Sequence, residues 1–469
     1  MSTKSANYNH DTIVAIATPS GSGAISVIRL SGKDSLTLCI NHFNPAKSKL
    51  TADNIETHKL YLGYFIDDDK NVIDEVLISF FKNPSSYTSE DVIEISCHGS
   101  EYIQQKIIEI LINAGARTAE PGEFTLRAFL NGRMDLSQAE GVADLIASQS
   151  ASSHSIAMNQ MRGGISDKIS DLRKKLIDFA SLIELELDFS EEDVEFANRD
   201  QFNKLISELK EELDLLIGSF RMGNVIKQGI PVAIIGKPNV GKSTLLNAIL
   251  NEEKAIVSHI PGTTRDTIED TYIIGGYKFR FIDTAGLRKS EDIVESIGIG
   301  RTYEKIKQAT IILYVCDISS ITNETVENVL EEFKHYIQDE SKHFIFVANK
   351  IDELAELPSH IKEILELNTV FVSAKRKENI QLLTDSLINI VKKFNITSDV
   401  IVSNSRHYQA LMNTNTALSE IEAGFNNNVP TDLIAIDIRQ ALHELGTITG
   451  QITTDEVLGN IFGKFCIGK

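Results

Sequence analysis

The stretch at positions 236–243 reads Gly236-Lys237-Pro238-Asn239-Val240-Gly241-Lys242-Ser243 and fits the pattern GxxxxGK[ST]. The apolar run 232–235 before it predicts a strand, and residues 244–250 after it predict a helix. Glycines in such a turn let backbone N–H groups approach phosphate oxygens at a helix N-terminus, where the helix dipole favours anions. We therefore expect Lys242 to neutralise nucleotide phosphates and the Ser243 hydroxyl to ligate Mg²⁺, with a glycine-rich turn without a ligand as the alternative.

Three further motifs each follow a predicted strand. Asp283-Thr284-Ala285-Gly286 comes after residues 278–282, where a carboxylate can hold Mg²⁺ through water and a glycine N–H can sense the γ-phosphate. Asn349-Lys350-Ile351-Asp352 ends the next such strand, and the Asp352 carboxylate can accept two hydrogen bonds from guanine that adenine cannot donate. Ser373-Ala374-Lys375 would add backbone N–H groups to the base. Four elements in this order predict a domain that binds GTP.

The segment Gly262-Thr263-Thr264-Arg265-Asp266 lies between the first two motifs. A threonine here can complete the Mg²⁺ shell in the GTP state, and Thr264 is our choice, although the segment also suits a polar lead into a strand. Leu287 stands where Ras-like enzymes carry a glutamine that orients water, and leucine has no hydrogen-bonding group. The candidates for that task are the nearby carboxylates Glu291, Asp292 and Glu295. Each of them also suits a solvated acidic surface.

The hydrophobic pattern predicts several domains. Between 11 and 131, short β-like runs alternate with turns and a helical stretch at 102–113, which predicts an α+β domain. Those runs are 12–17, 24–30, 72–81 and 92–96. From 165 to 216, and again at 405–424 and 433–446, the pattern predicts long amphipathic helices.

The centre of the chain alternates strand-like and helical runs, which predicts a doubly wound α/β sheet. We therefore expect a multidomain α/β and α+β protein with a G domain inserted into a helical domain. The expected boundaries are 1–131 for the N-terminal domain, 132–227 and 393–469 for the two parts of the helical domain, and 228–392 for the G domain.

The composition is that of a globular protein, with 42% hydrophobic and 24% charged residues in 469. The chain carries 46 basic and 66 acidic side chains, and its formal charge of −20 repels nucleic acid unless basic groups gather locally. The four cysteines lack metal-ligand spacing, so we expect reduced thiols. We see no leader at the N-terminus and no apolar stretch long enough to cross a bilayer, and we expect a cytoplasmic protein without membrane contact.

Several stretches together resemble the MnmE (TrmE) family of tRNA-modification GTPases along essentially the whole chain. They are GKPNVGKS at 236–243, GTTRD at 262–266, DTAGLR at 283–288, NKID at 349–352, PGEFTLRAFLNGRMDLSQAE at 121–140 and the terminal FCIGK. The resemblance implies an N-terminal domain that binds folate, a helical domain and a Ras-like G domain. It also implies a potassium-dependent GTPase that forms a homodimer, and a heterotetramer with the FAD-dependent partner MnmG (GidA). Together these proteins would add a carboxymethylaminomethyl group at carbon 5 of the wobble uridine of certain tRNAs.

The same resemblance implies individual roles. Glu295 matches the catalytic glutamate that orients water, and the K⁺-contacting positions are matched by Asn239, Ser258, Ile260 and Thr263. The nucleotide-binding set, with Ser243 and Thr264 as Mg²⁺ ligands, comprises Asn239, Val240, Gly241, Lys242, Ser243, Thr244, Ser258, His259, Ile260, Pro261, Gly262, Thr263, Thr264, Asp283, Thr284, Ala285, Gly286, Asn349, Lys350, Asp352, Ser373, Ala374 and Lys375. The positions that would contact 5-formyl- or 5,10-methylene-tetrahydrofolate are matched by Arg29, Glu94, Arg133 and Lys469. Cys466 matches a cysteine near the folate, although a lone cysteine is as often a small buried apolar residue.

Two other functions compete with this interpretation. A ribosome-assembly GTPase of the Era or Der type shares the leucine after the DxxG motif, but it places its RNA-binding module or second G domain differently, and folate binding would distinguish it. A non-catalytic switch, whose GTP state only recruits a partner, needs no cation for chemistry, so potassium-stimulated hydrolysis would separate it from the enzyme.

Overall fold

The structure is a computed structural model that describes residues 11–47, 51, 54–188, 199–252, 270–282, 304, 306–339, 341–354, 368–393, 400–427 and 429–468. The chain divides into two compact units. The first comprises Met1–Ala143, Gln160–Phe202 and Thr416–Lys469, and the second comprises Asp144–Asn159 and Asn203–Asn415. Each unit is therefore assembled from segments that are distant in the sequence.

The N-terminal part of the first unit is a seven-stranded sheet in the order β3-β4-β5-β6-β2-β1-β7. Its strands are β1 (Ile13–Ile16), β2 (Ile25–Ser31), β3 (Phe43–Pro45), β4 (Lys59–Ile66), β5 (Val72–Phe81), β6 (Val92–His98) and β7 (Arg117–Thr118). Helix α2 (Glu101–Asn113) packs on β1, β2, β5 and β6, and helix α1 (Ser35–Asn41) packs on β3 and β6. The predicted α+β domain is confirmed.

Strand β4 is absent from the sequence-based prediction. Its outward-facing residues Leu60, Leu62 and Tyr64 are apolar, and they are exposed by 66%, 48% and 39%. The inward-facing residues Gly63 and Phe65 are buried. Because both faces of the strand carry apolar side chains, the alternation that reveals a half-buried strand is missing here.

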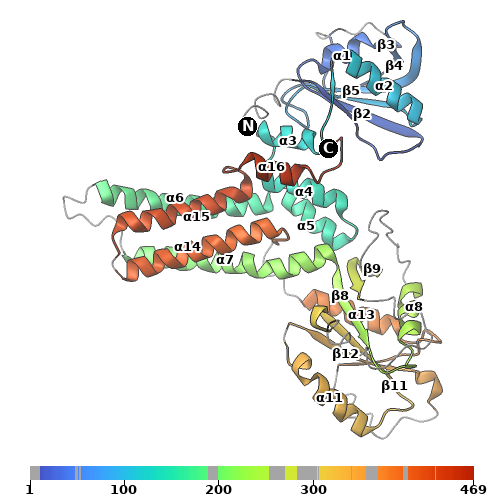
Figure 1. Cartoon of the computed structure of the whole chain (residues 1–469), viewed down its shortest axis with the longest axis vertical. Coiled ribbons are helices and arrows are strands. Elements are labelled where there is room, and N and C mark those ends of the chain that lie inside the picture. Colours follow the sequence, from blue (N-terminus) through green and yellow to red (C-terminus); the bar gives the residue numbers. More distant parts are fainter. Residues whose placement is uncertain are drawn as a thin grey trace. The chain divides into compact units, whose positions relative to one another are not determined.

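The helical elements include the long helices that the apolar pattern predicts at 165–216, 405–424 and 433–446, together with shorter helices that it does not predict. They are α3 (Glu123–Leu130), α4 (Leu136–Ala147), α5 (Ala151–Met161), α6 (Gly164–Asp188), α7 (Arg199–Gln228), α14 (Ser405–Asn426), α15 (Thr431–Thr449) and α16 (Asp455–Phe462). Helices α6 and α15 lie side by side in the first unit (Figure 1). The ring of Phe202 packs between two others, with its centroid 4.4 Å from that of Phe179 and 3.8 Å from that of Phe425. No helix of the described residues is long and apolar enough to cross a membrane.

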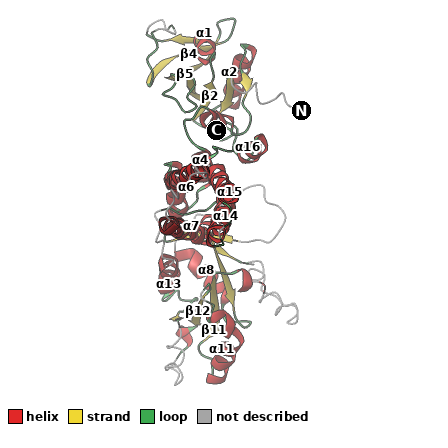
Figure 2. Ribbon diagram, turned by 90° about the vertical axis from the view of Figure 1, so that its left-hand side faces the viewer, coloured by secondary structure: helices red, strands yellow, loops and turns green. Residues whose placement is uncertain are grey.

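The second unit contains a six-stranded sheet in the order β13-β12-β11-β8-β10-β9. Strands β11 and β12 of this sheet are labelled in Figure 2. Its strands are β8 (Ile230–Ile235), β9 (Asp270–Ile274), β10 (Tyr277–Phe281), β11 (Ile311–Asp317), β12 (His343–Asn349) and β13 (Thr369–Phe371). All neighbouring strands are parallel except β9 and β10. The predicted doubly wound sheet is therefore confirmed, with one antiparallel edge strand.

Helices cover both faces of this sheet. Val232 and Ile234 of β8 join the core beneath α8 (Lys242–Glu252) and α13 (Ile380–Lys393), whereas Ala233 and Ile235 join the core beneath α11 (Asn323–Ile337). Successive residues of a strand point to opposite faces, so a fully apolar strand needs helices on both sides. Burying one leucine of such a core contributes about 1.5–3 kcal/mol. The packing holds the carboxyl ends of the parallel strands, where the predicted motifs lie, at one edge.

Candidate nucleotide site

The loop after β8 has the backbone that its glycines predict. Gly236 has φ +144° and Gly241 has φ +94°, and a Cβ added there would collide with the carbonyl oxygen of Val315 and with the side chain of Asn349, respectively. Asn239 also lies in the left-handed region, with φ +62°. Neither glycine can be replaced without displacing its neighbours.

Lys242 begins helix α8 and its ammonium lies over the loop. Its Nζ donates to the carbonyls of Gly236 and Lys237 at 2.9 Å and 2.7 Å. Ser243 is half-buried and Thr244 is exposed in the first helical turn. The loop therefore gathers a cation, a hydroxyl and a helix N-terminus in one place, which is an arrangement that suits phosphate and a hard metal ion.

Asn349 is the last residue of β12, and it joins two loops. Its Nδ2 donates to the Val240 carbonyl at 2.8 Å, and its Oδ1 accepts from the Ala374 backbone N–H at 3.0 Å. The side chain is buried, with the residue 2% exposed. This one amide thus ties the phosphate loop to the segment Ser373-Ala374-Lys375.

Asp352 follows Asn349 in a short 3₁₀ helix, η2 (Ile351–Glu353). The Ser373 hydroxyl donates to its Oδ1 at 2.6 Å and accepts from the Arg376 backbone N–H at 3.1 Å. The hydrogen bond from Ser373 lowers the pKa of the Asp352 carboxyl, and Arg376 and Lys375 add to this effect by their charge. The carboxylate is therefore ionised at neutral pH, and it can accept from N–H donors of a base.

The Lys350 side chain pairs with an acidic residue at the end of the neighbouring strand. Its Nζ donates to the Oδ2 of Asp317, the last residue of β11, at 2.7 Å. The sequence motifs do not single out Asp317, because the stretch Asp317-Ile318-Ser319 after a strand matches no nucleotide-binding pattern. Its position could have indicated a role in the site, since it is an acidic residue at the carboxyl end of a central strand.

A second cluster lies on the N-terminal sheet. Arg29 and Glu94 are directly opposite each other on β2 and β6, and Nε and Nη2 of Arg29 donate to Glu94 Oε1 at 2.9 Å and 2.7 Å. The guanidinium lies 5.3 Å from the Tyr87 ring centroid and 5.7 Å from that of Phe124. Its Nη1 donates to the Gly468 carbonyl at 3.3 Å, so the C-terminal segment reaches this pair.

The other predicted folate residues lie near this cluster or outside the described part. Arg133 is exposed and lines a cavity of about 620 Å³ together with Tyr87, the ring that also contacts Arg29. Cys466 is exposed and lines an apolar cavity of about 830 Å³ with Ile16, Ile108 and Ile467, so its interpretation as a buried apolar residue is wrong. Its neighbours do not remove it from water because the C-terminal segment lies at the surface.

A large part of the predicted site lies outside the described residues. These residues are Ser258, His259, Ile260, Pro261, Gly262, Thr263, Thr264, Asp283, Thr284, Ala285, Gly286, Glu295 and Lys469.

The parallel sheet, the phosphate loop after β8 and the Asn-Lys-x-Asp motif after β12 define a GTPase domain of the P-loop class. Two family models match nearly the whole chain: the MnmE helical domain over residues 136–466, and the N-terminus of the GTP-binding protein TrmE over residues 12–133. The chain belongs to the MnmE family of tRNA modification GTPases. It is a GTPase, and nucleotide and Mg²⁺ use follow from that class.

Curated relatives cover nearly the whole chain. The tRNA modification GTPase MnmE of Christiangramia forsetii is 54% identical over 98% of this chain and 99% of its own length. The proteins of the same name from Flavobacterium psychrophilum and Bacteroides thetaiotaomicron are 53% and 49% identical, each over 98% of this chain and 99% and 100% of their own lengths. Among solved structures, the G domain of the T. maritima FeoB iron transporter matches 34% of this chain and 97% of its own length, with 27% identity and a TM-score of 0.25. The full-length relatives exclude the Era or Der alternative.

Proposed function

We propose that this chain hydrolyses GTP with stimulation by K⁺, and that with an MnmG (GidA) partner it adds a carboxymethylaminomethyl group at carbon 5 of the wobble uridine of certain tRNAs. The observation that carries the GTPase part is the side chain of Asn349, which holds the phosphate loop and the base-binding segment together through Val240 and Ala374. The tRNA part rests on family membership, since the relatives are named tRNA modification GTPases.

The described residues suit the steps of nucleotide binding. Lys242 can exchange its two loop carbonyls for phosphate oxygens, because both sets of acceptors lie within reach of one ammonium. We propose that the Ser243 hydroxyl, at the start of α8, is one Mg²⁺ ligand and that Thr264 supplies another. Bound Mg²⁺ neutralises charge on the β and γ phosphates. The Asp352 carboxylate accepts from guanine, and the backbone of 373–375 supports the base.

Asn239 is proposed as a K⁺ ligand together with Ser258, the Ile260 carbonyl and Thr263. Its side chain is exposed at the tip of the phosphate loop, and it makes no hydrogen bond to any residue in the described ranges. An amide oxygen without a partner among the described residues, beside a phosphate site, suits a hard monovalent cation. A cation there supplies positive charge to the transition state.

Glu295 is proposed as the catalytic residue. Leu287 occupies the position of the water-orienting glutamine and cannot hydrogen-bond. A carboxylate eight positions later is close enough in sequence to take over that task, acting on water directly or through a second water.

The cluster at Arg29 is proposed to bind 5-formyl- or 5,10-methylene-tetrahydrofolate, with Arg133 and Lys469 as further contacts. A carboxylate such as Glu94 can accept from pterin N–H groups, and basic side chains suit the glutamate tail of the folate. The rings of Tyr87 and Phe124 flank the guanidinium, and Tyr87 is half-buried whereas Phe124 is fully buried, so Tyr87 is the ring that can offer apolar surface to a ligand. The folate, when bound, supplies the one-carbon unit.

A homodimer through the N-terminal domain is also proposed. The outer face of the sheet exposes Leu60 and Leu62 of β4 and Leu77 of β5, which is 43% exposed and pairs directly with Leu62. Ser79, two residues further along β5 on the same face, pairs with Glu94. The apolar surface is therefore continuous with the Arg29 cluster, and covering it with a second copy removes it from water.

The formal charge of −20 is compatible with a tRNA substrate if MnmG supplies basic surface.

The experiment that tests the proposal compares GTP hydrolysis in matched KCl and NaCl buffers with Mg²⁺, for the unsubstituted protein and for Glu295→Ala. We expect strong activation by KCl that is lost in the variant, while nucleotide binding is retained. Equal rates in the two salts would contradict a potassium site at Asn239 and would favour the non-catalytic switch whose GTP state only recruits a partner. Loss of nucleotide binding in Glu295→Ala would assign that residue a structural role.

A further inference from the structure

Asp317 makes a contact that the nucleotide motifs do not include. It ends β11, where it pairs in register with Asn349, and the next residue after Asn349 is Lys350. The Lys350 ammonium donates to Asp317 Oδ2 at 2.7 Å, and the two side chains are 27% and 15% exposed. No other hydrogen bond or ion pair of the Lys350 side chain occurs within the described part of the chain. The position of the Lys350 side chain therefore depends on Asp317.

The carboxylate of Asp317 is itself held in place. Its Oδ1 accepts from the Ser319 hydroxyl at 2.6 Å and from the Ser319 backbone N–H at 3.0 Å. Burial opposes ionisation, but the hydrogen bonds from Lys350 and Ser319 outweigh it and lower the pKa of Asp317. An ionised carboxylate with three donors is a rigid anchor for a lysine, in contrast to a surface ion pair between two mobile side chains.

The order of the strands places this ion pair between the phosphate loop and the base-binding motif. In the sheet, β11 lies between β8, which leads into the phosphate loop, and β12, which leads into Asp352. A nucleotide that reaches from Lys242 to Asp352 must cross the carboxyl end of β11. Lys350 leaves β12 with φ +69°, and its side chain stretches back to β11, so its methylene groups lie along that crossing.

We propose that Asp317 is a positioning residue for guanine-nucleotide binding, which holds the Lys350 ammonium so that the methylene stem forms a fixed apolar wall for the base. This inference rests on the nucleotide site of the proposed function. A lysine stem covers apolar surface well while its charged end stays solvated or paired. A stem that is already ordered loses less conformational entropy when the nucleotide binds than a free lysine would lose.

The test measures the dissociation constant and dissociation rate of a fluorescent GDP in the full-length protein and in Asp317→Asn. Ser319 and Lys350 contact different oxygens of Asp317, so an amide places its NH₂ group, a donor, against one of them, and it carries no charge. We expect about tenfold weaker GDP binding, mainly through faster dissociation, while turnover at saturating GTP changes less than twofold. Ser319→Ala is the matched control, because it removes the hydroxyl donor but keeps the Ser319 backbone N–H and the charged pair with Lys350, and it should change GDP affinity less than twofold.

A second variant separates positioning from a general structural role. Lys350→Met keeps an apolar stem of similar length and removes the ammonium, so adding Asp317→Asn to it should weaken GDP binding no further. Wild-type affinity in Asp317→Asn, or an undiminished effect in the Lys350→Met background, would overturn the inference. If the unsubstituted protein failed to bind GDP, the proposed function itself would fall, and this inference with it.

Discussion

The side-chain amide of Asn349 and the backbone carbonyl of Val240 are joined by a hydrogen bond of 2.8 Å, although 109 positions separate the two residues. The same amide accepts from the Ala374 N–H at 3.0 Å. Three loops that follow β8, β12 and β13 are thereby held in one arrangement by one buried side chain. The nucleotide site depends on this arrangement because its phosphate and base contacts come from different loops.

Replacing Asn349 with Ala should therefore damage both stability and binding. The substitution leaves the Val240 carbonyl and the Ala374 N–H without their partner, and each buried group left unpaired costs about 1–3 kcal/mol. We expect GDP affinity to fall at least about tenfold, with a lower melting temperature of the second unit. Equilibrium GDP titration and calorimetry of the same samples check this, and an unchanged affinity would show that the loops are held independently of Asn349.

Asp352→Asn should change the base that is preferred. Xanthine carries an acceptor where guanine carries its 2-amino donor, so the side-chain NH₂ of asparagine can donate to xanthine and opposes guanine. We expect GDP binding to weaken by about two orders of magnitude, which corresponds to the loss of about 2.7 kcal/mol, and XDP binding to strengthen. Competition of both nucleotides against a fluorescent analogue measures this, and parallel losses for both would contradict a direct role of Asp352 in reading the base.

Gly241→Ala tests the strained backbone of the phosphate loop. At φ +94°, a side chain is strained by about 1–2 kcal/mol, and the added Cβ would collide with the Asn349 amide. We expect loss of measurable GDP binding. Gly218 is the matched control, since it lies in α7 with nothing within 4 Å of an added Cβ, and Gly218→Ala should stabilise by about 1 kcal/mol without affecting GDP. Retained binding in Gly241→Ala would show that the loop can relax.

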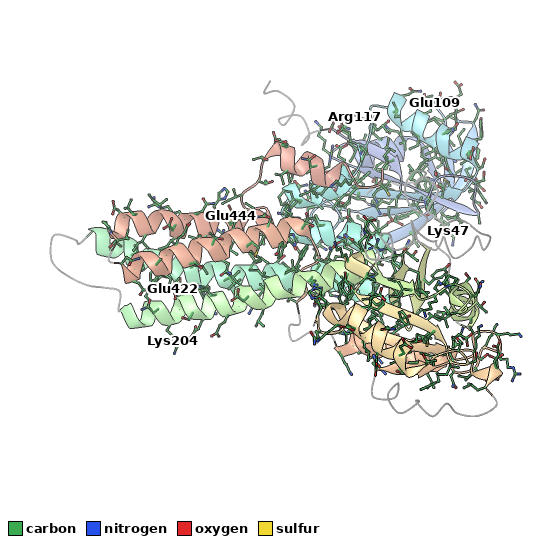
Figure 3. All side chains as sticks on the ribbon, turned by 60° about the horizontal axis from the view of Figure 1, so that its bottom comes forward. Lys47, Glu109, Arg117, Lys204, Glu422 and Glu444 are labelled. Carbon is green, nitrogen blue, oxygen red and sulfur yellow. The ribbon has the colours of Figure 1, made fainter. Side chains whose placement is uncertain are left out.

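The N-terminal core should lose stability in acid. Glu123 and Arg127 are both 1% exposed and paired at 3.0 Å, and Arg117 (labelled in Figure 3) bonds Glu123 at 2.6 Å and Asp11 at 2.7 Å. Burial would raise the pKa of Glu123 and of Asp11, but the hydrogen bonds and charges of the arginines lower both below their usual values.

A lowered carboxyl pKa means that the stabilisation is complete above the unfolded values of about 4.3 for Glu and 3.9 for Asp. The stabilisation is then lost as the pH falls through the lower folded values. Unfolding of the protein followed from pH 7 to pH 3 should show a fall in stability that begins below about pH 4.3. Glu123→Gln should be less stable at pH 7 and should flatten this pH dependence. A variant with the same pH dependence as the unsubstituted protein would exclude Glu123 as its source.

Much of the fold could be predicted from local patterns. The apolar runs 232–235 and 343–348 predict buried parallel strands because a strand that is covered on both faces has no polar side, and the steps of three or four residues predict α6 and α7. Strand β4 could not be predicted, because Leu60 and Leu62 are apolar on the exposed face and remove the alternation. The exposure of Cys466 could likewise not be predicted from the sequence, since it depends on where the C-terminal segment lies in the fold.

The sequence by itself determined the chemistry of the phosphate loop and of the Asn-Lys-x-Asp motif, because each is a short local pattern whose backbone and side-chain requirements are met within a few residues. Only the tertiary structure decided which distant residues serve those motifs. Asp317 anchors Lys350 because β11 and β12 are neighbours, and Arg29 meets the Gly468 carbonyl across 439 positions because the C-terminal segment returns to the N-terminal sheet. Such contacts arise from the packing of whole elements, and no local period in the chain encodes them.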